Sequence, residues 1–188
     1  MNQPTTSIVI AVVVIVLAVA VIAWLYWRKR RSGLLRERFG PEYERVVRDK
    51  GDVRKAEGVL QMRARKREEL RIVPLSAAVR SDFSRRWMQV QSRFVDDPKG
   101  AVADADQLVT EIMHARGYPM ADFDHQAEII SVDHPVVVQN YRAAHEIALR
   151  HGRGQASTED LRKAMVHYRS LFDELLEDSI PQRKEARG

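Results

Sequence analysis

The chain has 188 residues, of which 45% are apolar and 30% are charged, a composition typical of a globular protein with one domain of ordinary size. Cysteine is absent, which excludes a disulfide framework, a thiol nucleophile and any Cys-ligated zinc or iron-sulfur site. The net charge of +5 is spread unevenly, because residues 28–71 carry 16 Lys and Arg against 8 Asp and Glu, whereas residues 72–188 carry 15 against 18.

An uninterrupted apolar segment covers residues 8–27, which read IVIAVVVIVLAVAVIAWLYW and include no charged side chain. Twenty residues at about 1.5 Å each span the hydrocarbon core of roughly 30 Å. Because a lone segment in lipid must satisfy its own backbone, we expect a transmembrane helix. Residues 1–7 carry no Lys or Arg, whereas RKRR follows at 28–31. This asymmetry predicts a short extracytoplasmic N-terminus and a cytoplasmic C-terminal domain.

A cleaved secretory signal is the alternative interpretation of this segment, since Ala18-Val19-Ala20 resembles a cleavage site. The basic region that precedes the apolar part of such signals is missing, the apolar run continues past Ala20, and RKRR would follow the cut. We therefore favour an uncleaved anchor and a single-pass protein of the inner (plasma) membrane.

Beyond the anchor, apolar residues recur at helical spacing between Gly and Pro breaks, and no alternating strand pattern occurs. The sequence predicts an all-α protein in which the anchor precedes a cytoplasmic bundle of about five to six helices. We assign residues 28–71 to a basic juxtamembrane helical region, 72–178 to the helical bundle and 179–188 to a disordered tail.

Helix starts are marked in chain order by capping residues. A short helix follows Gly40-Pro41, and later helices are expected to begin at the caps Asp52, Ser76 and Asp97, after Pro135, and at Ser157 or Thr158. The stripe Val79, Phe83, Trp87, Val90 and Phe94 is typical of a face packed in the core rather than of a ligand site.

The connection from residue 116 to residue 135 is long for a helical bundle, although residues 123–130 fit a short helix. Long connections often carry function. We therefore predict that a protein partner binds there, through Arg116, Tyr118, Phe123, Asp133 and His134.

The basic region next to the anchor suggests contact with anionic lipid headgroups. A stripe for nucleic acid is the alternative, although no aromatic residue interleaves for base stacking and Glu68 and Glu69 neutralise part of the charge. The residues that we expect to contact lipid are Arg28, Lys29, Arg30, Arg31, Arg63, Arg65, Lys66 and Arg67.

Acidic and His residues concentrate between residues 122 and 146 and could in principle bind a metal. Their spacing matches no familiar scheme, because Leu149 stands where an HExxH motif would need its second His, and Asp133-His134 reverses the His-Asp order of helical phosphohydrolases. The alternative is that Asp133 caps a helix and the His residues are ordinary. Glycine-rich phosphate loops and GxSxG elbows are also missing, so we predict neither a catalytic or metal site nor a cofactor.

Several strings together resemble an uncharacterised family of bacterial single-pass membrane-anchored proteins with a helical cytoplasmic domain. They are WRKRR, RFGPEYERVV, FVDDPKGAVADADQLVTEIMHARGYP, SVDHPVVVQNYRAAHEIA and STEDLRKAMVHYRSLFDELLE. The resemblance covers nearly the whole chain and implies bacterial origin and the anchored topology, but no activity.

From these features we expect a membrane-tethered protein-interaction or scaffolding module without enzymatic activity. A membrane-anchored nucleic-acid-binding protein is the first alternative, and a metal-dependent helical hydrolase is the second. The expected partners are the anionic lipids of the membrane and a protein, with nucleic acid less favoured.

Overall fold

The computed structural model describes the backbone of residues 3–177, and the side chains of residues 15–177 apart from Leu25 and Arg28. The predicted tail 179–188 lies outside the described residues. All regular structure in the described part is helical, which confirms the all-α prediction. The helices there are α1 (Gln3–Phe39), α2 (Pro41–Lys50), α3 (Val53–Glu68), α4 (Ala77–Arg93), α5 (Pro98–Ala115), α6 (Phe123–Asp133), α7 (Val137–Gly152) and α8 (Thr158–Leu176).

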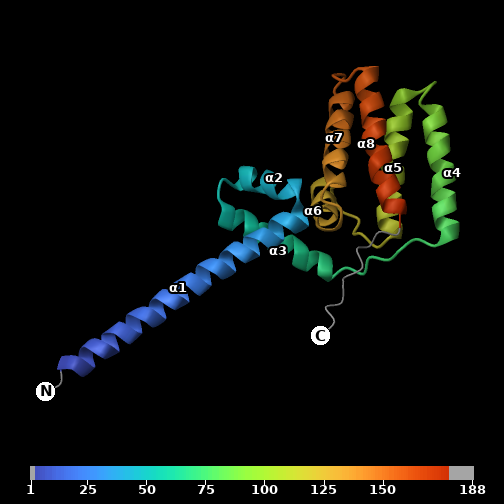
Figure 1. Cartoon of the computed structure of the whole chain (residues 1–188). Coiled ribbons are helices and arrows are strands. Elements are labelled where there is room, and N and C mark those ends of the chain that lie inside the picture. The colour runs from blue at the N-terminus through green and yellow to red at the C-terminus, as the bar shows by residue number, and fades with distance from the viewer. Residues whose placement is uncertain (1–2, 178–188) are drawn as a thin grey trace.

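Helix α1 projects from the rest of the molecule as one long rod (Figure 1). It runs without a break through the predicted span and the basic residues after it, and it ends at Phe39, before Gly40, whose φ of 45° lies in the left-handed region. In the part of the chain that the structure describes, no helix presents a stretch long and apolar enough to cross a membrane. The side chains of residues 8–14 lie outside the described residues.

The end of α1 packs with α2 and α3 around a small apolar cluster of its own. Helices α1 and α3 run side by side, since Arg31 contacts Gln61 and Arg38 contacts Glu68 thirty residues further on. One residue of α6 also joins this cluster, so the first three helices are attached to the bundle. The cluster consists of Leu35, Phe39, Tyr43, Val46, Ala56, Leu60, Ala64 and Val132.

Helices α4, α5, α7 and α8 form the main bundle, and they stand side by side in Figure 1. Helix α8 packs against both α5 and α7, whereas α4 packs mainly on α5 at the edge. The ring of Trp87 on α4 stacks on Phe172 of α8 with 4.6 Å between the centroids. Trp87 is therefore part of the core, as its position in the apolar stripe predicts.

Four of the predicted caps are confirmed. The side chains of Asp52, Ser76, Asp97 and Ser157 each accept a hydrogen bond from a backbone N–H in the first turn of α3, α4, α5 and α8. The alternative role of Asp133 as a cap is wrong, because this residue ends α6 rather than starting a helix. Helix α6 is also longer than the short helix 123–130 that the sequence suggests.

Candidate functional site

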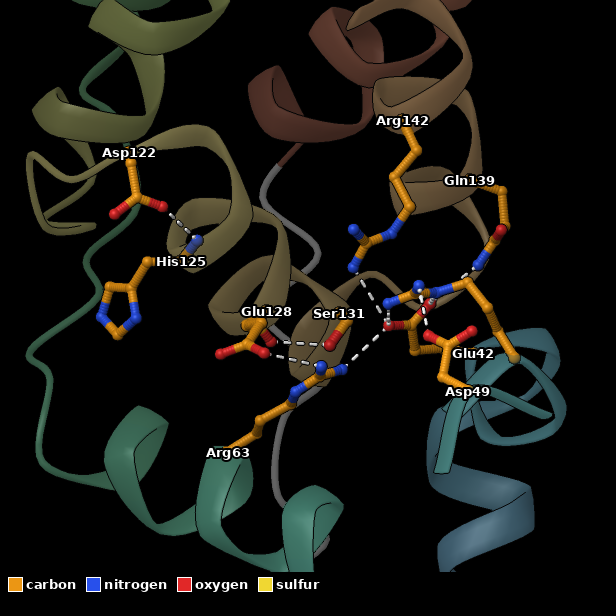
Figure 2. A network of polar contacts seen from close by, with 10 residues as sticks. Glu42, Asp49, Arg63, Asp122, His125, Glu128, Ser131, Gln139 and Arg142 are labelled. Carbon is orange, nitrogen blue, oxygen red and sulfur yellow. Dashed lines mark hydrogen bonds and ion pairs between the residues drawn. The ribbon is translucent and has the colours of Figure 1, made fainter. Parts of the chain in front are cut away.

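A buried carboxylate, Glu42, lies where the first three helices meet the bundle, and arginines from three helices surround it (Figure 2). Arg63 of α3 donates to Oε1 at 2.9 Å and Arg142 of α7 donates to the same atom at 3.1 Å. Arg45 binds both oxygens through Nε and Nη2 at 2.9 Å, and Gln139 donates to Oε2 at 3.0 Å. Glu42 has no exposed surface, so this site joins helices and is closed to a substrate.

Two further carboxylates complete this Glu42 cluster, which we define as Glu42, Arg45, Asp49, Arg63, Glu128, Gln139 and Arg142. The second terminal nitrogen of Arg63 donates to Glu128 of α6 at 2.8 Å, and Arg45 donates to Asp49 at 2.9 Å. Three guanidinium groups therefore face three carboxylates, and the charges balance. Because these residues come from α2, α3, α6 and α7, the cluster fastens α2 and α3 to the rest of the bundle.

The position of Glu42 follows from the local sequence. Gly40 turns the chain and Pro41 begins α2, so Glu42 falls in the first turn, where the helix dipole favours an acidic residue. It precedes the buried Val46 by four residues and shares its inward face. That four-residue spacing is the sequence signal that could have revealed the inward position of Glu42.

Electrostatics keep the Glu42 carboxylate ionised. Burial alone would raise its pKa, but the hydrogen bond from Arg45 and the charges of Arg142 and Arg63 outweigh burial and lower it. The hydrogen bond to Glu42 raises the pKa of Arg45, while burial lowers the pKa of Arg142. The carboxylate thus stays charged at neutral pH and holds the three arginines together.

Most of the residues predicted to bind a partner are turned inward. Tyr118 donates to the Asp133 carboxylate at 2.9 Å, and Arg67 of α3 binds the same oxygen. Burial and the nearby Asp133 raise the pKa of Tyr118, which keeps its hydroxyl protonated as a donor. Arg116 is fully buried and donates to the Leu175 carbonyl at 2.8 Å. The side chains of Tyr118 and Arg116 are therefore closed to a partner in this conformation.

The other two residues of that prediction also make internal contacts. His134 is buried, and its Nδ1 lies 2.9 Å from a carboxylate oxygen of Glu174 on α8. Phe123 is half-buried and stacks on the His145 ring with 3.6 Å between the centroids. Phe123 and Asp133, whose side chain is 14% exposed, keep part of their surface open, but the contacts of the five residues mainly link α3, α6 and α8.

The predicted lipid-contact residues divide into exposed and internal ones. Arg63 is only 6% exposed and belongs to the Glu42 cluster, and Arg67 is held by Asp133. Neither Arg63 nor Arg67 is therefore available to lipid headgroups, because Arg63 pairs with Glu42 of α2 and Glu128 of α6, and Arg67 pairs with Asp133 of α6. The side chain of Arg28 lies outside the described residues, and the exposed members are Lys29, Arg30, Arg31, Arg65 and Lys66. The basic stripe of α3 suggested for nucleic acid is interrupted in the same way.

The acidic and His residues between 122 and 146 serve separate structural roles. Asp122 caps α6, Asp133 accepts from Tyr118 and Arg67, and His134 contacts Glu174. In the described residues, no group of three or more His, Asp or Glu side chains is placed to hold a metal ion.

A groove of about 230 Å³ opens between α4 and α8 on the bundle surface. The apolar side chains of Trp87, Phe94, Met165 and Val166 line it. At its edge, the Arg169 guanidinium lies 5.7 Å from the Trp87 ring centre and donates to Asp173. The Trp87 indole N–H is buried and has no acceptor among the described residues. This groove is an accessible place where the bundle presents apolar surface beside charged groups.

Comparison with known protein families finds no matching model, and neither the curated proteins nor the solved structures contain a match.

Proposed function

We propose that this protein is a single-pass, membrane-tethered interaction module. Residues 8–27 anchor it in the plasma membrane, and the cytoplasmic helical bundle binds a protein partner at the membrane surface. It holds that partner near the bilayer and performs no chemistry on it.

One observation carries the tether: the described part of α1 exposes apolar side chains in every direction. Ile15, Val16 and Leu17 are consecutive and are 61%, 60% and 61% exposed. Successive helical residues point about 100° apart, so these three span about 200°, and the exposed Val21 and Ile22, at 54% and 66%, cover the rest of the circumference. Burying one such side chain is worth about 1.5–3 kcal/mol. A bilayer supplies that burial on all sides, whereas a single protein contact covers only one side.

The groove between α4 and α8 supports the interaction part of the proposal. Val166 stands at this groove and is 56% exposed, next to the apolar floor formed by Trp87 and Phe94. Aromatic residues and arginines in a partly enclosed apolar site are enriched among the residues that dominate protein interfaces. The exposed basic residues next to the anchor would add about 1 kcal/mol each through anionic headgroups.

Membrane topology is tested by single cysteines, because the natural chain has none and gives no labelling background. We expect Thr5→Cys to react with a membrane-impermeant maleimide on intact cells, and Lys163→Cys to react only after permeabilisation. The protein should stay in the membrane pellet after alkaline carbonate. Release by carbonate, or labelling of Lys163→Cys in intact cells, contradicts the tether.

Partner binding is tested by in-cell crosslinking of the full-length chain with Val166→Glu. The matched control is Leu149→Glu, since Leu149 is a similarly exposed aliphatic residue, 53% against 56%, on α7 away from the groove. We expect wild type and Leu149→Glu to form the same discrete adduct and Val166→Glu to lose it. An adduct that persists in Val166→Glu places the partner elsewhere, and no adduct in wild type argues against an interaction module.

A further inference from the structure

A second cleft, of about 300 Å³, lies between the end of the apolar part of α1 and the start of α3. Trp24, Trp27 and Arg31 line it from α1. The α3 side consists of Arg54, Glu57, Gly58 and Gln61. The cleft therefore combines two indole rings with charged groups of both signs.

The fold places this cleft at the level where the predicted span ends. Because α3 runs beside α1 in the same direction, Arg31 meets Gln61 at 2.5 Å, and the first turn of α3 lies beside Trp24 and Trp27. From Trp24 to Arg31 is a rise of about 10 Å along a helix. Indole rings at the end of an apolar span favour the headgroup layer. The start of α3 thus reaches back into that layer.

The charges in the cleft do not neutralise one another. Arg54 and Glu57 are three residues apart on α3, a spacing at which side chains can pair, yet no ion pair joins them in the described structure. Tyr43 donates to one Glu57 oxygen at 3.0 Å from the inner side. One terminal nitrogen of Arg31 donates a hydrogen bond to the Gln61 side-chain oxygen. Donors for a phosphate and an acceptor for an ammonium are therefore both present.

Gly58 has no side chain, so the α3 wall of the cleft is open at this residue. A Cβ added there would meet nothing within 4 Å, so the space beside its backbone is unfilled. A ligand can lie against α3 between the side chains of Arg54 and Gln61, with Trp27 opposite.

We propose that this cleft is a specific site for an aminophospholipid headgroup. Arg54 and Arg31 bind the phosphate, and Glu57 accepts hydrogen bonds from the primary ammonium. The indoles of Trp24 and Trp27 contact the adjoining glycerol and upper acyl carbons. A purely anionic headgroup fits less well, because it would set its phosphate near the Glu57 carboxylate without an ammonium between them. This site rests on the proposed tether, since only an anchored chain brings the cleft to the headgroup layer.

The test is native mass spectrometry of the full-length protein in detergent, titrated with phosphatidylethanolamine or phosphatidylcholine of identical acyl chains. Both lipids have no net charge, so general attraction to the basic region cancels. Methylation of the ammonium removes its N–H donors, and we expect wild type to retain phosphatidylethanolamine about tenfold more tightly, as for one charge-assisted hydrogen bond.

Variants separate the two halves of the site. Glu57→Gln keeps an oxygen for Tyr43 but loses the charge, and it should abolish the preference. Arg54→Gln should weaken the binding of both phosphatidylethanolamine and phosphatidylcholine about tenfold. Lys55→Gln is the matched control, because Lys55 is exposed on the same turn outside the cleft, and it should bind like wild type. Circular dichroism checks that each variant folds.

Equal retention of the two lipids by wild type, or a preference that survives Glu57→Gln, overturns the proposal. Phosphatidylglycerol forms a third arm on the wild-type protein: if wild type retains phosphatidylglycerol more tightly than phosphatidylethanolamine and binds phosphatidylethanolamine and phosphatidylcholine alike, the cleft takes an anionic headgroup and the aminophospholipid site is refuted. Loss of the tether is recognised separately, by carbonate extraction and cysteine labelling.

Discussion

Substitution of Glu42 by Gln removes the negative charge that holds the Glu42 cluster together and leaves its shape nearly unchanged. Arg45, Arg63 and Arg142 then face each other with a neutral amide between them, and the new NH2 group points donors at donors. Breaking one partner of a buried ion pair costs about 3–5 kcal/mol. The side chains of Arg45 and Arg142 are 26% and 18% exposed, and solvent screens them. We therefore expect the lower end, about 3 kcal/mol.

For a chain of this size, 1 kcal/mol shifts Tm by roughly 2–4 °C, so Glu42→Gln should lower Tm by about 6–12 °C. The assay is thermal unfolding of the full-length protein in detergent, followed by circular dichroism. Glu44→Gln is the control on the same helix, because Glu44 pairs with Arg36 at 3.2 Å on the surface and should contribute less than about 1 kcal/mol. If both variants melt at the same temperature, the Glu42 cluster does not fasten the helices.

The same comparison has a defined pH dependence. Because the pKa of Glu42 is lower in the folded state than its ordinary value of 4.5, its stabilising contribution is complete above pH 4.5 and is lost as pH falls through the lower folded pKa. Wild type and Glu42→Gln should thus differ most near neutral pH and converge in acid. A difference in Tm that stays constant from pH 7 down to pH 3 contradicts the assigned charge state.

Four further substitutions test the packing. Gly117→Ala should destabilise the protein more than Gly154→Ala. Both glycines have a positive φ, but only at Gly117 would an added Cβ meet a backbone oxygen, that of Arg71, at 2.5 Å. We expect Gly154→Ala to lower the free energy of unfolding in urea by about 1–2 kcal/mol. Tyr118→Phe removes the donor to Asp133 and should cost about 1–2 kcal/mol, and an unchanged urea midpoint would show that this hydrogen bond is dispensable. Phe172→Ala leaves a cavity at a fully buried position and should lower the free energy of unfolding by about 3–5 kcal/mol. A Tm near that of wild type would contradict the packing of α4 on α8.

Local chemistry in the sequence predicts most of the helix starts. Asp52, Ser76, Asp97 and Ser157 act as caps because a short polar side chain can reach a free N–H two or three residues ahead, and only neighbours in the chain are involved. The apolar stripe that includes Trp87 likewise predicts its burial, since one face of a helix is fixed by residue spacing.

Charged residues are harder to place from sequence, as Arg63 and Glu42 illustrate. Arg63 follows the apolar positions of α3 in a run of basic residues, which indicates a solvated face. Its two carboxylate partners stand 21 and 65 residues away in the chain, so no local pattern reveals them. The connection 116–135 is similar, because its polar residues bind Arg67, Leu175 and Glu174 from distant helices.

The sequence by itself determined the all-α class, the caps and the apolar faces, because these depend on interactions within a few residues. Only the tertiary structure decided which charges are buried, which loop is structural, and that the start of α3 lies beside Trp24 and Trp27. A buried charge needs a partner to offset its lost hydration, and that partner is chosen by the way helices pack rather than by its place in the chain.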